Sequence, residues 1–183
     1  MNPLASAPRE WGARSPRRWV ARAPWAPLAL AIVVVDQLTK AWAVDALGDG
    51  RRIDLFWTLR FNLTYNTGMS FGAGQGWGPI IGVVAMIVVV VLLLSLQRGG
   101  AGGRATTLAV GAIVGGAVGN LIDRIFREPQ WLRGGVVDFI DFQWFPIFNV
   151  ADMGITVGGA VLLLVSWRAG RHPAAETTQV ADD

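Results

Sequence analysis

Two aspartates in this chain stand in apolar surroundings with no basic residue beside them in the sequence. Asp138 lies in the segment GVVDFI at positions 135–140, and Asp152 ends the segment FNVAD at 148–152, where an apolar stretch begins. The rest of the chain reads as a membrane protein. An ionisable group at the centre of a membrane span costs at least about 2.5–3.5 kcal/mol and usually marks a functional site. The two aspartates are therefore the first candidates for chemistry.

A pair of carboxyl groups about 3 Å apart can hydrolyse a peptide bond, because like charges at that separation lead the pair to share one proton. The ionised member takes a proton from water, which attacks a carbonyl carbon. The protonated member polarises that carbonyl and then protonates the leaving amine. This chemistry needs neither a metal nor a nucleophilic side chain.

Each aspartate also has a structural interpretation. Asn149 as the N-cap and Asp152 three residues later resemble a capping box at a helix start. Asp138 could be an exposed loop acid, although Asp141 fits that description better. If Asp138 is instead buried, its pKa should be raised. We favour the catalytic pair because both acids lack a neighbouring cation.

The residue types that are absent restrict the alternatives. The chain has no cysteine, and its one histidine, His172, lies in a polar C-terminal segment. Thiolate sites and cysteine nucleophiles are excluded, and a zinc site or a histidine-based triad is disfavoured. We therefore expect no metal and no cofactor.

Four further charged residues lie within or at the ends of predicted apolar spans. Asp36 and Lys40, the only lysine, are one helical turn apart and can neutralise each other. This pair could serve only to let the segment insert, or it could contact substrate. Asp123 abuts Arg124 at a predicted helix C-terminus, where the helix dipole favours the cation. We assign Asp123 a structural part and Arg124 a positioning part.

The composition predicts an all-α membrane protein with four spans. The chain of 183 residues is 52% hydrophobic, its mean hydropathy is +0.42, and a bilayer span takes about 20 apolar residues. Four segments qualify, at about 25–47, 78–96, 106–126 and 149–167. They form one domain over 24–169, and residues 1–23 and 170–183 are expected to be disordered cytoplasmic tails. The basic N-terminal region resembles a signal peptide, but polar residues at 36–40 interrupt the apolar stretch, so we expect a retained first span.

The arginines predict the orientation. Nine lie before the first span, between the second and third spans, or after the fourth, against six in the other two connections. The positive-inside rule then places both termini in the cytoplasm. Because the arginines flank apolar segments instead of forming a stripe, the net charge of +3 is not interpreted as nucleic-acid binding.

Apolar and polar residues alternate between the first and second spans, at about 50–66. The apolar set is expected to share one face, with Phe56 as an exception: Ile53, Leu55, Trp57, Leu59, Phe61, Leu63 and Tyr65. This period of two predicts a small sheet on the outer membrane surface. It could be a simple connecting hairpin, or a platform whose edge accepts an extended peptide.

Five motifs resemble lipoprotein signal peptidase (signal peptidase II), in the order expected of that family. They are DQLTK at 36–40, NTGMSF at 66–71, GAVGNLIDR at 116–124, VVDF at 136–139 and FNVAD at 148–152. The resemblance covers about residues 28–167. It implies an aspartic protease of the bacterial inner membrane, with four helices and a small extracytoplasmic β-cradle.

The resemblance also implies a substrate and a set of site residues. The enzyme would cleave prolipoproteins just before a diacylglyceryl-modified cysteine and be sensitive to globomycin. We expect it to act among membrane lipids as a monomer. The family's catalytic dyad falls on Asp138 and Asp152. Its surrounding polar residues fall on the following positions, all but Asp123 taken as substrate-binding: Asp36, Lys40, Asn66, Gly68, Asn120, Asp123, Arg124, Asn149 and Ala151.

Two features depart from the family pattern. The connection from Arg124 to Asp138 is longer than usual, with residues 127–133 inserted, and Ser70 stands where alanine is common. They put the shape of a local lid in question, and not the assignment.

Two other functions are compatible with parts of the sequence. Lys40 and Ser70 could form a Ser–Lys dyad, because a lysine in an apolar site can act as a base. Alternatively, intramembrane acids could serve a proton-coupled transporter. Transporter sites lie near the membrane midplane between repeats, and this chain shows no internal symmetry.

Overall fold

Four long helices make up most of the structure, a computed structural model that describes residues 25–68, 77–97, 103–129 and 131–171. They are α2 (Trp25–Leu47), α3 (Gly78–Gln97), α4 (Arg104–Phe126) and α5 (Val150–Gly170). Each is long and apolar enough to cross a membrane, and each lies within a few residues of a predicted span. The predicted tails lie outside the described residues, apart from Gly170 and Arg171.

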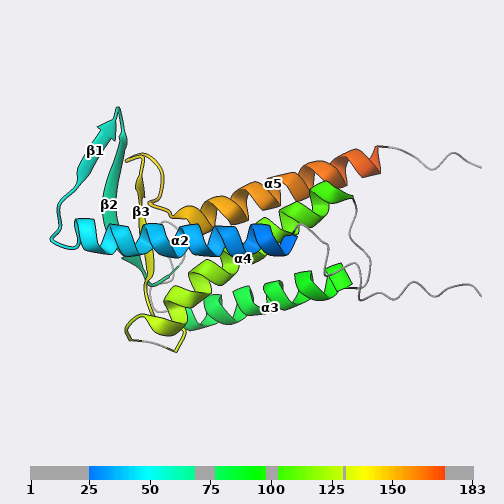
Figure 1. Ribbon diagram of the computed structural model, residues 1–183, viewed down its shortest axis with the longest axis horizontal. Coiled ribbons are helices and arrows are strands. Elements are labelled where there is room, and N and C mark those ends of the chain that lie inside the picture. Colours follow the sequence, from blue (N-terminus) through cyan, green and yellow to red (C-terminus); the bar gives the residue numbers. More distant parts are fainter. Residues whose placement is uncertain (1–24, 69–76, 98–102, 130, 172–183) are drawn as a thin grey trace, which may run out of the picture.

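Helix α4 is the centre of the bundle. It packs against each of the other three helices, and more than half of its most apolar stretch is buried. Figure 1 shows α4 running diagonally, from beside the end of α5 to beside the start of α3. A side chain at Gly116 would place its Cβ 2.2 Å from the backbone oxygen of Ala151, so only glycine lets α4 approach the start of α5 this closely.

A three-stranded antiparallel sheet lies at one end of the bundle (Figure 1). Its strands are β1 (Ile53–Phe56), β2 (Leu59–Asn66) and β3 (Val136–Asp141), in that spatial order. The hairpin of β1 and β2 was predicted, but β3 was not. Five of its six residues are buried, so the strand shows no alternation in the sequence. The sheet therefore joins the segment between α2 and α3, which holds β1 and β2, to the segment between α4 and α5, which holds β3.

The predicted single apolar face of the hairpin is only partly correct. Phe61 and Leu63 pack toward the core, whereas Leu55 and Trp57 are exposed. The register shifts between Asp54 and Phe56, and Trp57 has a φ of 53° at the turn. A bulge and a turn each change the phase of the alternation, which a strict period of two does not allow for.

Apolar contacts fix the sheet on α2. Ala43 and Leu47 of α2 are buried together with Val137 and Phe139 of β3. Since β3 alternates its side chains between two faces, burying Val137 and Phe139 against α2 turns Asp138, between them, toward the other side. There α4 and α5 lie.

Two adjacent glycines of α5 offer a matched test of this packing. A methyl group at Gly158 would lie 2.6 Å from the backbone oxygen of Ala109, whereas one at Gly159 meets no atom within 4 Å. Both changes to alanine gain about the same helix propensity. We expect Gly158→Ala to lower the thermal unfolding temperature in detergent, at a cost of about 1–3 kcal/mol from overpacking, and Gly159→Ala to leave it unchanged or higher. Equal effects would contradict the tight α4–α5 contact.

Candidate active site

Asp138 and Asp152 come from different elements and line one cavity. Asp138 is on β3 and is 2% exposed, and Asp152 is half-buried in the first turn of α5. The cavity has a volume of about 280 Å³. Its other walls are apolar or carry single polar groups: Asn66, Gly68, Ile81, Ala85, Ala117, Asn120, Leu121, Arg124, Val136 and Ile155. The two uncompensated acids of the sequence are thus brought to the same space.

Two asparagines connect the aspartates. Asn149 donates from Nδ2 to Oδ1 of Asp138 at 2.6 Å, and Asn120 donates from Nδ2 to Oδ1 of Asp152 at 2.8 Å. The asparagines are themselves joined, Asn149 Nδ2 to Asn120 Oδ1, at 3.1 Å. The two carboxyl groups are thus linked through the side-chain amides of Asn149 and Asn120.

The capping box predicted at the start of α5 is present together with these contacts. Asp152 N–H donates to Asn149 Oδ1 at 3.0 Å, and Asn149 N–H donates to Asp152 Oδ2 at 3.2 Å. The structural interpretation of Asp152 and its place in the cavity are therefore compatible. Because the side-chain oxygen of Asn149 accepts the cap bond, its NH₂ group is free to point at Asp138.

Burial changes the acidity of Asp138. Desolvation, followed by the nearby carboxyl of Asp152, raises the pKa of Asp138 to about 7. Hydrogen bonds from Asn66 and Asn149 and the charge of Lys40 oppose this shift. The pKa of Asp138 is thus raised, as the sequence predicts for a buried carboxyl group. At neutral pH both its protonated and its ionised form are populated.

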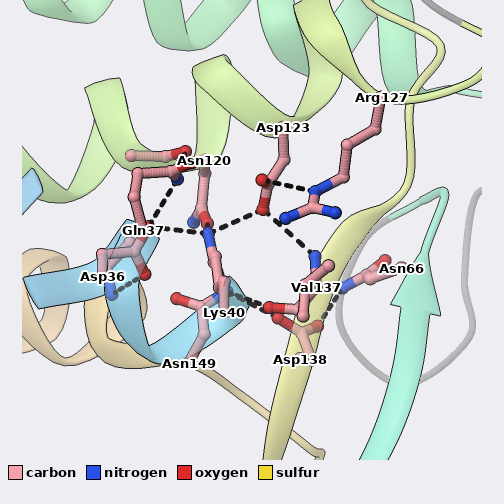
Figure 2. A network of polar contacts seen from close by, with 12 residues as sticks. Asp36, Gln37, Lys40, Asn66, Asn120, Asp123, Arg127, Val137, Asp138 and Asn149 are labelled. Atoms are coloured by element: carbon pink, nitrogen blue, oxygen red, sulfur yellow. Dashed lines mark hydrogen bonds and ion pairs between the residues drawn. The ribbon is translucent and has the colours of Figure 1, made fainter. Parts of the chain in front are cut away.

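An ion-pair network centred on the buried side chains of Lys40, Asp36 and Asp123 lies beside the cavity (Figure 2). Lys40 Nζ is 2.8 Å from Asp36 Oδ2 and 2.8 Å from Asp123 Oδ2, and it donates to Asn120 Oδ1 at 2.9 Å. The predicted pair of Asp36 with Lys40 is confirmed. The second carboxylate oxygen of Asp123 accepts from Arg127 Nε at 2.7 Å.

The same two carboxylates hold backbone groups next to the cavity aspartates. Ala151 N–H donates to Asp36 Oδ1 at 2.9 Å. Val137 N–H donates to Asp123 Oδ2 at 3.2 Å. Since Ala151 precedes Asp152 and Val137 precedes Asp138, the network fixes the backbone from which each acid projects.

Arg124 is buried with one donor unused. Its Nη2 donates to the backbone oxygen of Gly68 at 3.2 Å, whereas Nη1 has no partner in the described part of the chain. A buried unpaired donor is unfavourable unless a ligand or water completes it. Asn66, which donates to Asp138 Oδ2 at 3.1 Å and accepts from Gly68 N–H, lies at the same wall of the cavity.

Asp141 is not the exposed loop acid that the sequence suggested. It is 3% exposed and accepts from Arg60 Nε at 2.7 Å and from Asn62 Nδ2 at 3.0 Å. Burial opposes its ionisation, but these hydrogen bonds and that from Gln143 N–H outweigh it, and the pKa of Asp141 is lowered. The strand pairing of Arg60 with Asp141 was not predicted, because strand β3 was not predicted.

Sequence reasoning missed two residues of the network. Arg127 follows Asp123 by four positions, a spacing that favours an ion pair on a helix and could have identified it. Gln37 donates to Asp36 Oδ2 and to the backbone oxygen of Gly119, each at 3.1 Å. Nothing in the sequence marks Gln37, because the contact across to α4 depends on helix packing.

Lys40 is not available as the base of the alternative Ser–Lys dyad. The ammonium group of Lys40 has three N–H donors, and Asp36, Asp123 and Asn120 occupy them. Ser70 and the shape of the motif around it lie outside the described residues.

Four membrane-length helices around a cavity that holds two aspartates define a multi-pass membrane protein with a carboxyl-based site. The model of the family "signal peptidase (SPase) II" matches residues 28–168, and the chain belongs to this family of aspartic peptidases. This membership excludes the transporter alternative. The resemblance drawn from the five motifs is confirmed.

Named relatives agree with the family match. The lipoprotein signal peptidase of Mycobacterium avium (strain 104) is 40% identical over 139 residues, which cover 75% of each chain. That of Mycobacterium leprae (strain Br4923) is 36% identical over 76% of this chain and 69% of its own. That of Bifidobacterium longum (strain DJO10A) is 38% identical over 77% and 76%.

Two solved structures share the fold. One, a bacterial membrane enzyme solved at 2.3 Å resolution, superposes with a TM-score of 0.74 at 24% identity, over 83% of this chain and 92% of that one. A second bacterial membrane enzyme, solved at 1.9 Å resolution, superposes with a TM-score of 0.66 at 26% identity, over 78% of this chain and 91% of that one. The four-helix architecture with a small sheet is thus confirmed.

Asn149 combines a capping role with a role toward Asp138, and two substitutions separate them. Serine keeps an oxygen that can cap α5 but has no amide donor, whereas alanine keeps neither. We expect Asn149→Ser to keep the cap of α5, to lose the stability that the amide's hydrogen bonds contribute, and to reduce peptidase activity about 10²-fold. Asn149→Ala should lose the same activity and in addition about 1 kcal/mol of stability. Full activity in Asn149→Ser would contradict the role of the amide.

Proposed function

We propose that Asp138 and Asp152 are the catalytic pair of an endopeptidase that removes signal peptides from diacylglyceryl-modified prolipoproteins, cleaving before the lipidated cysteine. The observation that carries the proposal is the convergence of these two acids, on one cavity, in a chain of the signal peptidase II family. The names of the relatives supply the substrate class.

We assign the two carboxyl groups different roles. Each accepts two hydrogen bonds, Asp152 from Asn120 Nδ2 and Asn149 N–H and Asp138 from Asn66 Nδ2 and Asn149 Nδ2. The assignment therefore rests on burial, because Asp138 is 2% exposed whereas Asp152 is half-buried, and burial favours the protonated form. Asp152 is the general base: it takes a proton from a water molecule in the cavity, which attacks the scissile carbonyl carbon. Asp138, with a pKa of about 7, is the acid: it donates a hydrogen bond to the carbonyl oxygen and then transfers its proton to the leaving nitrogen, so that one proton remains on the pair, on Asp152.

Substrate contacts fall to the residues that reach the cavity. Arg124 Nη1 is an unused donor that suits a peptide carbonyl, and Asn66, Gly68 and Asn120 line the same space. The apolar wall from α3 and α5 suits the hydrophobic part of a signal peptide. By contrast Asp36, Lys40, Asn149 and Ala151 are fully buried, and we assign them positioning roles instead of substrate contact.

The sheet contributes to the site through two strands. Asn66 ends β2, and Val136 and Asp138 belong to β3, whereas no residue of β1 lines the cavity. A peptide added to the free edge of β1 would lie away from Asp138. We therefore infer that the substrate passes beside the ends of β2 and β3, and that β1 supports them.

The remaining expectations concern the setting. We place the enzyme in the bacterial cytoplasmic membrane, with both termini in the cytoplasm and the sheet on the outer side, from the excess of arginines on one side. We expect it to act as a monomer without metal or cofactor. Inhibition by globomycin-type cyclic peptides should accompany the proposed substrate.

Substitution of each aspartate tests the proposal. Purified Asp138→Asn and Asp152→Asn should be folded but slower on a synthetic diacylated prolipoprotein by about 10²–10⁴-fold, the range of a lost acid or base. Asp54→Asn is the matched control, because Asp54 is exposed on β1. Near-normal activity in either folded cavity variant would contradict the pair.

The pH profile tests the role of Asp138. A raised pKa means that the protonated form persists to about pH 7, so an acid at this position is present below that pH and lost above it. We expect kcat/KM, which reports the free enzyme, to fall as the pH rises through about 7. Asn66→Ala should move this limb to higher pH, because it removes a donor that stabilises the ionised form. A profile that rises through this range would contradict the assignment.

A further inference from the structure

Lys40 is remote from any substrate although it is central to the site. Its side chain is 0% exposed, and its ammonium group contacts three acceptors, Asp36, Asp123 and Asn120, at 2.8, 2.8 and 2.9 Å. No N–H of the ammonium group remains for a ligand, and Lys40 does not line the cavity. Apart from the effect of its charge on Asp138, any influence of Lys40 on the reaction must therefore pass through its three partners.

Two of the partners hold the backbone of the cavity aspartates. Asp36 accepts the N–H of Ala151, one residue before Asp152. Asp123 accepts the N–H of Val137, one residue before Asp138. The single ammonium group of Lys40 joins the two carboxylates, so a continuous path of short contacts connects the start of α5 to β3 (Figure 2).

The third partner fixes the direction of an amide. Asn120 Oδ1 accepts from Lys40 and from Asn149 Nδ2, so its NH₂ group must face away from both. There it donates to Asp152 Oδ1 at 2.8 Å. If Asn120 were reversed, an NH₂ group would face the ammonium of Lys40 and Asp152 would lose a donor.

We propose that Lys40 is a positioning residue that sets both the separation of Asp138 from Asp152 and the amide orientation that keeps Asp152 supplied with a donor. This inference rests on the proposed function. It differs from a role in folding alone, because buried ion pairs give little net stability compared with well-packed apolar residues. A methionine at this position could fill the space but could not hold two carboxylates at one point.

The test compares Lys40→Met and Lys40→Arg with wild type and with Asp138→Asn, using purified protein and a synthetic diacylated prolipoprotein. Methionine is close in length and removes the charge; arginine keeps the charge but presents a planar fork in place of a compact ammonium group. Each variant is first checked for folding by thermal unfolding in detergent. The values of kcat, KM and their pH dependence are then measured.

We expect kcat to fall about 10²-fold in both variants, the size of effect that small displacements of reacting groups produce. KM should stay within about threefold of wild type, because no substrate contact is lost. The charged groups near Asp138 are Lys40, Arg124 of α4 and Asp152 of α5. The charge of Lys40 lowers the pKa of Asp138. Lys40→Met removes this charge and should move the basic limb of the pH profile to higher pH, whereas Lys40→Arg keeps the charge and should leave the limb near its wild-type position.

Three results would overturn the inference. The first is a folded variant with wild-type kcat. The second is a rise in KM of about tenfold or more with kcat retained, which would indicate direct substrate contact. The third is a loss of kcat with an unchanged pH profile in Lys40→Met, as expected from a smaller folded fraction. If Lys40→Met does not fold, the kcat and KM of Lys40→Arg decide. Should wild type itself not cleave the substrate, or Asp138→Asn cleave it normally, the proposed function fails instead.

Discussion

The balance of charge at the sheet end of the bundle is the constraint on which the rest of the structure depends. Four carboxyl groups are brought together there, from Asp36, Asp123, Asp138 and Asp152. Three cationic groups face them, from Lys40, Arg124 and Arg127. Unbalanced charge in a poorly solvated site is costly. One proton on a carboxyl group removes the imbalance, and we assign that proton to Asp138, whose pKa burial and the nearby carboxyl of Asp152 raise to about 7. The asymmetry required of an acid and a base thus follows from one missing cation.

This constraint accounts for the way the elements are placed. The network needs α2 and α5 close to α4, and the absence of a side chain at Gly116 permits the backbone of Ala151 to approach. It needs the backbone of β3 within reach of Asp123, and the apolar contacts of Val137 and Phe139 with α2 hold the strand there. Packing and polar contacts therefore act on the same few residues, and a change to either is expected to affect catalysis.

The sequence predicted the helices well and the network less completely. Four spans were visible because apolar length is a local property, and Asp36 with Lys40 was visible because its spacing is local too. Strand β3 was missed because burial on both faces removes the alternation of polar and apolar residues. The pairing of Asp141 with Arg60 was missed for the same reason, since Asp141 belongs to β3. The contact of Gln37 with Gly119 and the bridge of asparagines between the two aspartates depend on how helices meet. Spacing along one element cannot reveal such contacts.

The most direct test of the account is an infrared titration of the carboxyl groups in purified protein, comparing wild type with Asp138→Asn. The account predicts a protonated carboxyl band in wild type that is lost between about pH 6 and 8, one unit either side of the pKa of about 7, and that is absent from the variant. If wild type shows no such band above about pH 5, Asp138 is ionised at neutral pH. The division of the pair into an acid and a base would then be wrong.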